Sequence, residues 1–292
     1  MSLLTSTAHT PERIFGLLKL LNMLGGESQR DIVQSIMDPD ASEETAFIQT
    51  IGAAASLNII EVDRTVLRSL IPTTPSSHAD FSDLCYDRLL ETANSGNSDV
   101  GEDSNALLYG AYAMVAFKSD QNRSLSWFCD DMDLDAFATE VRMAVAASDA
   151  TGALFNKTKL APWRRWMYNL GLIEEFDRNV FIPDVSRRLT AEISRSHLPK
   201  AGTQSALQFL GWVRTRMPFL PGGNLFASVT GQRPRLAECG VLLSAALRNL
   251  RDEGVLRLST VGDAAGQVTL SQDVADPIRS FSEISFTDRI AP

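Results

Sequence analysis

The sequence is poor in cysteine and histidine, with three of each among 292 residues. The cysteines, Cys85, Cys129 and Cys239, form no CxxC or Cys/His pattern. An odd number of dispersed cysteines favours neither a disulfide framework nor a zinc site, and it is typical of a reduced compartment. The scattered histidines form no metal motif either. We therefore expect no metal and no cofactor.

Long apolar runs are also missing. No run approaches the roughly 18 residues needed to span a membrane. The first residues lack the basic region and apolar core of a signal peptide. With 44% hydrophobic and 22% charged residues, the composition is that of a soluble globular chain of about two domains. We expect a cytoplasmic protein without membrane contact.

Catalytic patterns are lacking as well, since the chain has neither a glycine-rich phosphate loop followed by lysine nor a nucleophile elbow. Asp131, Asp133 and Asp135 copy the first ligands of a calcium loop. Ala136 and Arg142, however, stand where that loop needs glycine and glutamate. A solvated helix start explains these acids better. The sequence predicts no catalytic residue. An enzyme with an unrecognised site is kept as an alternative, after the two non-enzymatic functions given at the end of this section.

What the sequence does contain is a helix that leads into a β-hairpin, within residues 157–184. The basic helix ends at Asn169-Leu170-Gly171, and strands at 172–173 and 180–182 flank a polar turn. The same pattern occurs at residues 10–71 and again near the other end, with a helix at 236–253 and strands at 254–258 and 267–270. The prediction is a mainly α protein with small β-hairpin wings, of the α+β class, built of tandem winged-helix-like units.

Weaker signals complete the expected organisation. Ser28 followed by Asp31 resembles a capping box that opens a short helix, and residues 226–229 could form a short strand. The acidic stretch 92–104 is expected to be a loop, with no role assigned. The expected divisions are winged-helix unit 1 at 10–71; linker, acidic loop and helical segment at 72–133; unit 2 at 134–198; helical segment and unit 3 at 199–275; and a loosely ordered tail at 276–292.

The three copies share a phase. When they are aligned on the first apolar residue of the wing (Ile59, Leu172 and Val255), apolar residues stand five and twelve positions earlier. Positions seven apart lie on one side of a helix, so each helix presents an apolar stripe to its core. By the same logic Trp163 and Trp166 are expected to pack in the core rather than to stack on bases.

Charge is unevenly distributed behind the net charge of −9. Residues 76–155 hold 4 Lys/Arg and 14 Asp/Glu, whereas 156–257 hold 16 Lys/Arg and 8 Asp/Glu. Such a basic segment attracts the phosphate backbone through counterion release, and the repeat places Arg165 and Arg248 on the outward side of their helices. The candidate nucleic-acid-binding residues are Lys157, Lys159, Arg164, Arg165, Arg233, Arg235, Arg248 and Arg251. In the alternative interpretation these cations pair with the acidic segment or with a partner subunit.

Three segments together resemble a known family. TPERIFGLLKLLNMLGG at 10–26, NKTKLAPWRRWMYNLGLIE at 156–174 and the C-terminal winged unit resemble, in order and spacing, the DpdG accessory proteins of bacterial clusters that insert deazaguanine derivatives into DNA. The resemblance implies participation in a multi-protein DNA modification and restriction system. It provides no catalytic residue to carry over.

The expected function is therefore a non-enzymatic DNA-binding or adaptor subunit of a bacterial DNA modification or anti-phage defence system. Its expected partners are DNA and protein subunits of the same system, and the sequence does not give an oligomeric state. The alternative is a pure protein–protein adaptor, in which winged units of the kite type pack on other subunits without touching nucleic acid.

Overall fold

The structure is a computed structural model that describes residues 3–4, 10–40, 44–94, 106–128, 133–145, 155–177, 180–199, 202–233, 235–261, 266–273 and 276–287. Helices predominate in these ranges, and the strands form small antiparallel sheets, which confirms the mainly α, α+β class. No helix within them combines the length and hydropathy needed to cross a membrane. The chain packs as two compact units, residues 1–108 with 146–170 and residues 109–145 with 171–292. From here on, unit 1 and unit 2 mean these two compact units and not the expected winged-helix units.

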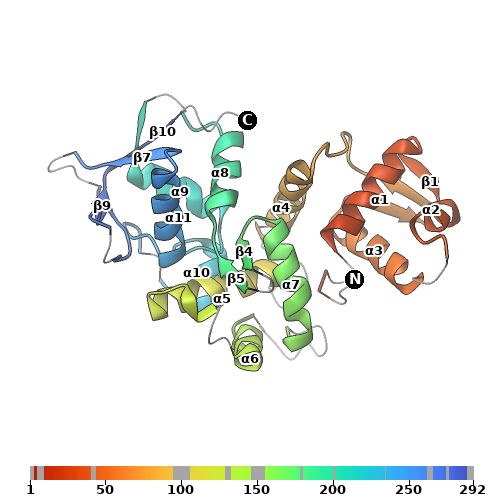
Figure 1. Ribbon diagram of the computed structural model, residues 1–292, viewed down its shortest axis with the longest axis horizontal. Coiled ribbons are helices and arrows are strands. Elements are labelled where there is room, and N and C mark those ends of the chain that lie inside the picture. Colours follow the sequence, from red (N-terminus) through yellow and green to blue (C-terminus); the bar gives the residue numbers. More distant parts are fainter. Residues whose placement is uncertain are drawn as a thin grey trace. The chain divides into compact units, whose positions relative to one another are not determined.

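The first half of unit 1 is a group of three helices and a three-stranded sheet (Figure 1). Its elements are α1 (Pro11–Met23), β1 (Glu27–Gln29), α2 (Arg30–Met37), α3 (Glu44–Ser56), β2 (Ile60–Asp63) and β3 (Val66–Ser69). The sheet has the order β1-β3-β2 with antiparallel pairing throughout. Thr10 caps α1 by accepting a hydrogen bond from the Arg13 amide at 3.3 Å. Helices and strands therefore follow the expected series, with one added strand.

That added strand, β1, was not predicted, and the capping box predicted at Ser28 is wrong. Ser28 lies in β1 opposite Leu67, and Gln29 stands at the N-cap of α2 without a side-chain cap bond. Pairing with β3 satisfies the backbone of this stretch, so tertiary contacts override the local capping preference. A three-residue strand has too short a pattern to be recognised in sequence.

The rest of unit 1 contains α4 (His78–Asn94), the first residues of α5 (Ala106–Asn122) and α7 (Lys157–Asn169). Trp163 and Trp166 of α7 are fully buried, which confirms the prediction that they pack in the core. The Trp163 indole N–H donates to the Leu108 carbonyl at 3.1 Å. The stripe predicted from the repeat is also confirmed, because all six of its residues are buried. These residues are Phe47, Ala54, Leu160, Met167, Leu243 and Leu250.

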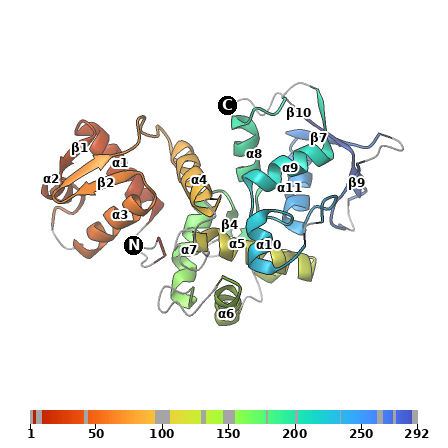
Figure 2. The same cartoon turned by 180° about the vertical axis from the view of Figure 1, so that it is seen from behind.

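Unit 2 holds the remainder of α5 and most of the strands (Figure 2). Its other elements are η1 (Ser126–Phe128), α6 (Leu134–Val145), β4 (Ile173–Asp177), β5 (Val180–Pro183), α8 (Ser186–Arg195), β6 (Thr203–Ser205), α9 (Ala206–Arg216), α10 (Asn224–Thr230), α11 (Val241–Asp252), β7 (Leu256–Ser259), β8 (Val268–Thr269), β9 (Ser280–Phe281) and β10 (Glu283–Phe286). The predicted hairpin of the central stretch is present as the antiparallel pair β4–β5.

A strand from the C-terminal segment forms the centre of the main sheet of unit 2. The order is β6-β10-β7, and β10 pairs antiparallel with both neighbours. Ile284 lies opposite Gln204 on one side and Leu258 on the other, and its side chain is fully buried. The expectation of a loosely ordered tail at 276–292 is therefore wrong for β9 and β10.

The third hairpin was also predicted with the wrong pairing. β7 pairs with β10, and β8 pairs with β9 instead of returning along β7. The sequence interpretation joined the two nearest strands, whereas β10 alternates half-buried and buried residues and so presents a full apolar face to the core. Sheet partners so distant in sequence leave no local signal.

Two more predictions around α10 need correction. Residues 226–229 lie in a helix rather than a strand, because Phe226 and Val229 bury one helical face and Gly231 ends the helix at φ +67°. α11 begins at Val241 rather than at 236, and Leu236 is exposed in the preceding loop. The repeat-based divisions at 71, 133, 198 and 275 stay a prediction, because the two compact units follow packing rather than the repeat.

Candidate nucleic-acid interface

One face of α7 is exposed and basic. Lys157, Ala161, Arg165 and Tyr168 are exposed, and their spacing of four, four and three places them along one side of the helix, while Thr158 is exposed beside them in the first turn. Lys157 and Arg165 stand about 12 Å apart along the axis, at 1.5 Å per residue. The opposite side carries the buried tryptophans, so core packing fixes the direction in which the basic face points.

The N-terminus of α7 concentrates positive charge. Asn156 caps it by accepting a hydrogen bond from the Thr158 amide at 3.1 Å, and the first turn carries Lys157 and Lys159 but no acid. The lysines add to the positive partial charge of the helix start instead of neutralising it. Desolvation lowers the pKa of the half-buried Lys159. This arrangement costs helix stability and favours an anionic ligand.

The two arginines of α7 differ in exposure. Arg165 forms an ion pair with Glu12 of α1 at 3.2 Å, and both side chains are about half exposed. Such a surface pair contributes little stability and leaves the guanidinium accessible to another anion. Arg164 is half-buried. The accessible cations of α7 are therefore Lys157 and Arg165, with Lys159 beside them.

Arg248 and Arg251 of α11 do not form an outward basic surface, and the outward orientation predicted for Arg248 is wrong. The Arg248 side chain is 8% exposed and lies 3.1 Å from the equally buried Asp276 carboxylate. Arg251 contacts the same carboxylate at 2.8 Å and donates a hydrogen bond to it. This hydrogen bond is the main reason why the pKa of Asp276 is lowered. Arg248 also donates to the Ser271 carbonyl at 2.7 Å. Both arginines anchor the C-terminal segment to α11.

The remainder of α11 offers no basic face. Its exposed residues are Asn249 and Asp252, and the Asn249 amide donates to Asp184 at 3.3 Å. The burial of Arg248 could not be predicted from the pattern of the helix and its hairpin alone. It arises because α8 and the segment around Asp276 cover the other sides of α11. Phosphate contact through α11 has no support in this geometry.

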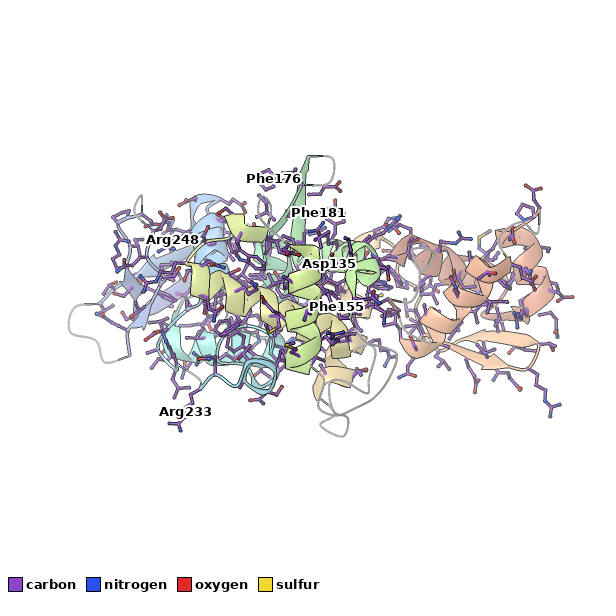
Figure 3. All side chains as sticks on the ribbon, turned by 90° about the horizontal axis from the view of Figure 1, so that it is seen from below. Asp135, Phe155, Phe176, Phe181, Arg233 and Arg248 are labelled. Atoms are coloured by element: carbon purple, nitrogen blue, oxygen red, sulfur yellow. The ribbon has the colours of Figure 1, made fainter. Side chains whose placement is uncertain are left out.

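Arg233 and Arg235 lie in the loop before α11 and are exposed. Arg233 extends from the loop into solvent (Figure 3), and its side chain has no partner among the described residues. Arg235 forms an ion pair with Glu238 at 3.0 Å, and Arg214 donates to the Arg235 carbonyl at 2.7 Å. The hydrogen bond from Arg214 thus holds the loop backbone at Arg235. The guanidinium group of Arg233 stays unpaired among the described residues.

The same loop borders a cavity of about 470 Å³ that lies within unit 2. Asp120 of α5 lines it and accepts a hydrogen bond from the Val241 amide at 2.7 Å, at the start of α11. Burial, only partly offset by this bond, raises the pKa of Asp120. Any side chain at Gly240 would meet the carboxylate, since its Cβ would lie 2.8 Å from an Asp120 oxygen. The glycine keeps the carboxylate against the helix start.

Cys239 also borders this cavity, but its thiol is not poised to react. Desolvation by burial raises the pKa of Cys239 to about 12, so the thiolate is scarce at neutral pH. Asp120 and Arg123 line this cavity but were not predicted from the sequence. They lie more than 100 residues from the loop that completes it, and no motif spacing links the two segments.

Comparison with known proteins identifies a family. A family model described as DpdG-like matches residues 1–264. No curated protein and no solved structure matches the chain significantly. The match spans unit 1 completely and unit 2 up to the residues before β8. Because it covers well over half of the sequence, the chain belongs to the DpdG-like family.

Proposed function

We propose that the chain is a non-enzymatic accessory subunit of a bacterial DNA modification and anti-phage defence system, and that it contacts the DNA backbone through α7. Family membership supports the system. The exposed face of α7, with Lys157 and Arg165 along one side and Lys159 at the helix start, is the observation that supports DNA contact. Two cations on one side of a helix attract backbone phosphates without reading bases.

Within this proposal, α7 contacts DNA, and the winged-helix units pack on other proteins. The series α1-β1-α2-α3-β2-β3 and the series α8-β6-α9-α11-β7-β10 both give a sheet in which the last strand lies between the other two. We infer two winged-helix units from this common order. Their third helices, α3 and α11, expose no Lys or Arg, so these units fit protein packing better than groove reading.

The backbone contact is tested by reversing the two exposed cations of α7. The variant Lys157→Glu/Arg165→Glu should bind duplex DNA at least about tenfold more weakly in 50 mM salt, and the slope of log K against log salt should fall by about 1.8, at about 0.9 per phosphate lost. Fluorescence anisotropy of a labelled duplex at four salt concentrations measures both quantities.

The control carries the same change of charge elsewhere. Arg142→Glu/Arg257→Glu removes two exposed arginines that have no partner among the described residues, and its salt slope should equal that of the unaltered chain. Equal slopes for the α7 variant and the unaltered chain would show that α7 does not meet phosphate.

A pure adaptor function is the second candidate, because unit 1 exposes apolar side chains close together in sequence. Met23 at the end of α1 is 81% exposed, and Ile32 and Ile36, one turn apart on α2, are 46% and 53% exposed. Exposed apolar residues at helical spacing favour contact with another protein. In this function unit 1 packs on a subunit of the same system and the cations of α7 meet acidic protein groups.

The adaptor function predicts that Ile32→Glu/Ile36→Glu abolishes co-purification with proteins co-expressed from the same gene cluster, without changing the melting temperature by more than a few degrees. Leu236→Glu/Val261→Glu places two charges at exposed apolar positions of unit 2 and serves as the control. If both variants retain the partner, the α2 face is not the contact surface.

A further inference from the structure

The cavity of unit 2 combines features that together define a ligand. Its volume of about 470 Å³ falls within the range of about 300–1,000 Å³ of small-molecule sites. Phe117 and Phe226 line it from α5 and α10, with their ring centroids 6.4 Å apart. Their planes are inclined by 64°, so an aromatic ring of the ligand can stack on one ring and meet the edge of the other.

Two lining arginines are available for an anion. Arg123 at the end of α5 and Arg233 in the loop before α11 are exposed, and neither side chain has a partner among the described residues. A guanidinium group without an internal carboxylate retains its full capacity for a bidentate contact with phosphate. Arg235, the third lining arginine, is already paired with Glu238. The cation pair therefore favours a phosphate group at the rim.

The carboxylate of Asp120 adds an acceptor between these features. One of its oxygens receives the Val241 amide, and an ionised carboxylate has further lone pairs for a ring N–H or an amino group. The position is fixed, because Gly240 leaves room for it and the start of α11 holds it. An aromatic ring with N–H donors and an attached phosphate is the chemistry of a nucleotide.

We propose that this cavity binds a nucleoside monophosphate, with its phosphate on Arg123 and Arg233 and its base against Phe117 and Phe226. The base donates an N–H to Asp120. The nucleotide is either free or the end of a single strand, since both present the same groups. The site lies in unit 2 and does not depend on the backbone contact proposed for α7.

Titration calorimetry of the full chain tests the proposal with the four common nucleoside 5′-monophosphates, the matching nucleosides, inorganic phosphate and a 5′-phosphorylated hexanucleotide. At least one nucleotide should bind with a Kd of about 10 µM, as its size allows. The nucleoside and inorganic phosphate should each bind at least about tenfold more weakly. Tight binding of the hexanucleotide alone identifies a strand end as the source, and tight binding of the mononucleotide identifies a free ligand.

Four variants test the location of the site. Arg123→Glu/Arg233→Glu should weaken binding about 100-fold or more, and Arg123→Gln/Arg233→Gln gives the same test with less change if the first variant does not fold. Arg257→Glu, an exposed arginine outside the cavity, should bind normally. Asp120→Asn keeps an oxygen for the Val241 amide, so it should fold while changing the order of preference among the four bases.

Several results overturn the proposal. One is the absence of binding by every nucleotide and by the hexanucleotide at about 2 mM. Another is inorganic phosphate that binds as tightly as the best nucleotide, which leaves an anion site without a base. A third is unchanged binding by both arginine double variants when circular dichroism shows that they are folded.

Discussion

Ile284→Asp is expected to unfold unit 2 at room temperature or to bring it close to unfolding. Ile284 is fully buried in β10, between β6 and β7. A carboxylate at this position loses the apolar burial of the isoleucine and enters the core without a partner, which together cost about 4 kcal/mol or more of the free energy of unfolding. Urea unfolding followed by circular dichroism measures the loss.

The neighbouring position provides a matched control. Ser285 lies on the same strand with its side chain on the opposite, half-buried face, so Ser285→Asp should cost less than about 1 kcal/mol. Equal losses for the two variants would mean that the strand is not held in this register.

Asp276→Ala should lower the free energy of unfolding by about 3 kcal/mol at pH 7, because it leaves the buried Arg248 guanidinium without its carboxylate. Arg251 loses a contact in the same change. The comparison variant, Asp252→Ala, removes the other acid that pairs with Arg251, an acid that is 67% exposed. Its cost should stay below about 1 kcal/mol. Similar costs for both variants would contradict an anchoring role of Asp276.

The pH dependence gives a second test of Asp276. Its folded pKa lies below the ordinary value because Arg251 hydrogen-bonds to the ionised carboxylate. The group therefore stabilises the fold above its unfolded pKa of about 3.9, and this contribution disappears as the pH falls through that value towards the folded pKa. The difference in stability between the unaltered chain and Asp276→Ala should be constant from pH 7 to pH 5 and should shrink below about pH 4.

Most helices could be predicted from the sequence because each carries its own evidence. In α7 the buried Leu160, Trp163 and Met167 repeat at helical spacing, and in α1 Thr10 and Pro11 mark the start. The strands β1, β6 and β10 could not be predicted in the same way. The first two are three residues long, and β10 pairs with segments far away in the sequence, so its partners depend on the assembled core.

The candidate site, too, could be predicted only where it depends on local helical periodicity. The basic face of α7 follows from helical periodicity, and the exposure of Lys157 and Arg165 agrees with it. Arg248 occupies the equivalent position in the repeat but is buried, because Asp276 comes back from the C-terminal segment to cover it. Local periodicity gives the direction of a side chain relative to its own helix. It gives no information about a distant segment that packs over that side.

The central position of β10 has a consequence for biosynthesis. Because a chain is synthesised from its N-terminus, β6 and β7 leave the ribosome before the strand that joins them exists. Until residues 283–286 emerge, both strands carry unpaired backbone groups, which are a risk for aggregation. The α1–α3 group of unit 1 has its three strands within residues 27–69 and can complete its sheet much earlier. Unit 2 is therefore the part whose main sheet cannot be completed before residues 283–286 have left the ribosome.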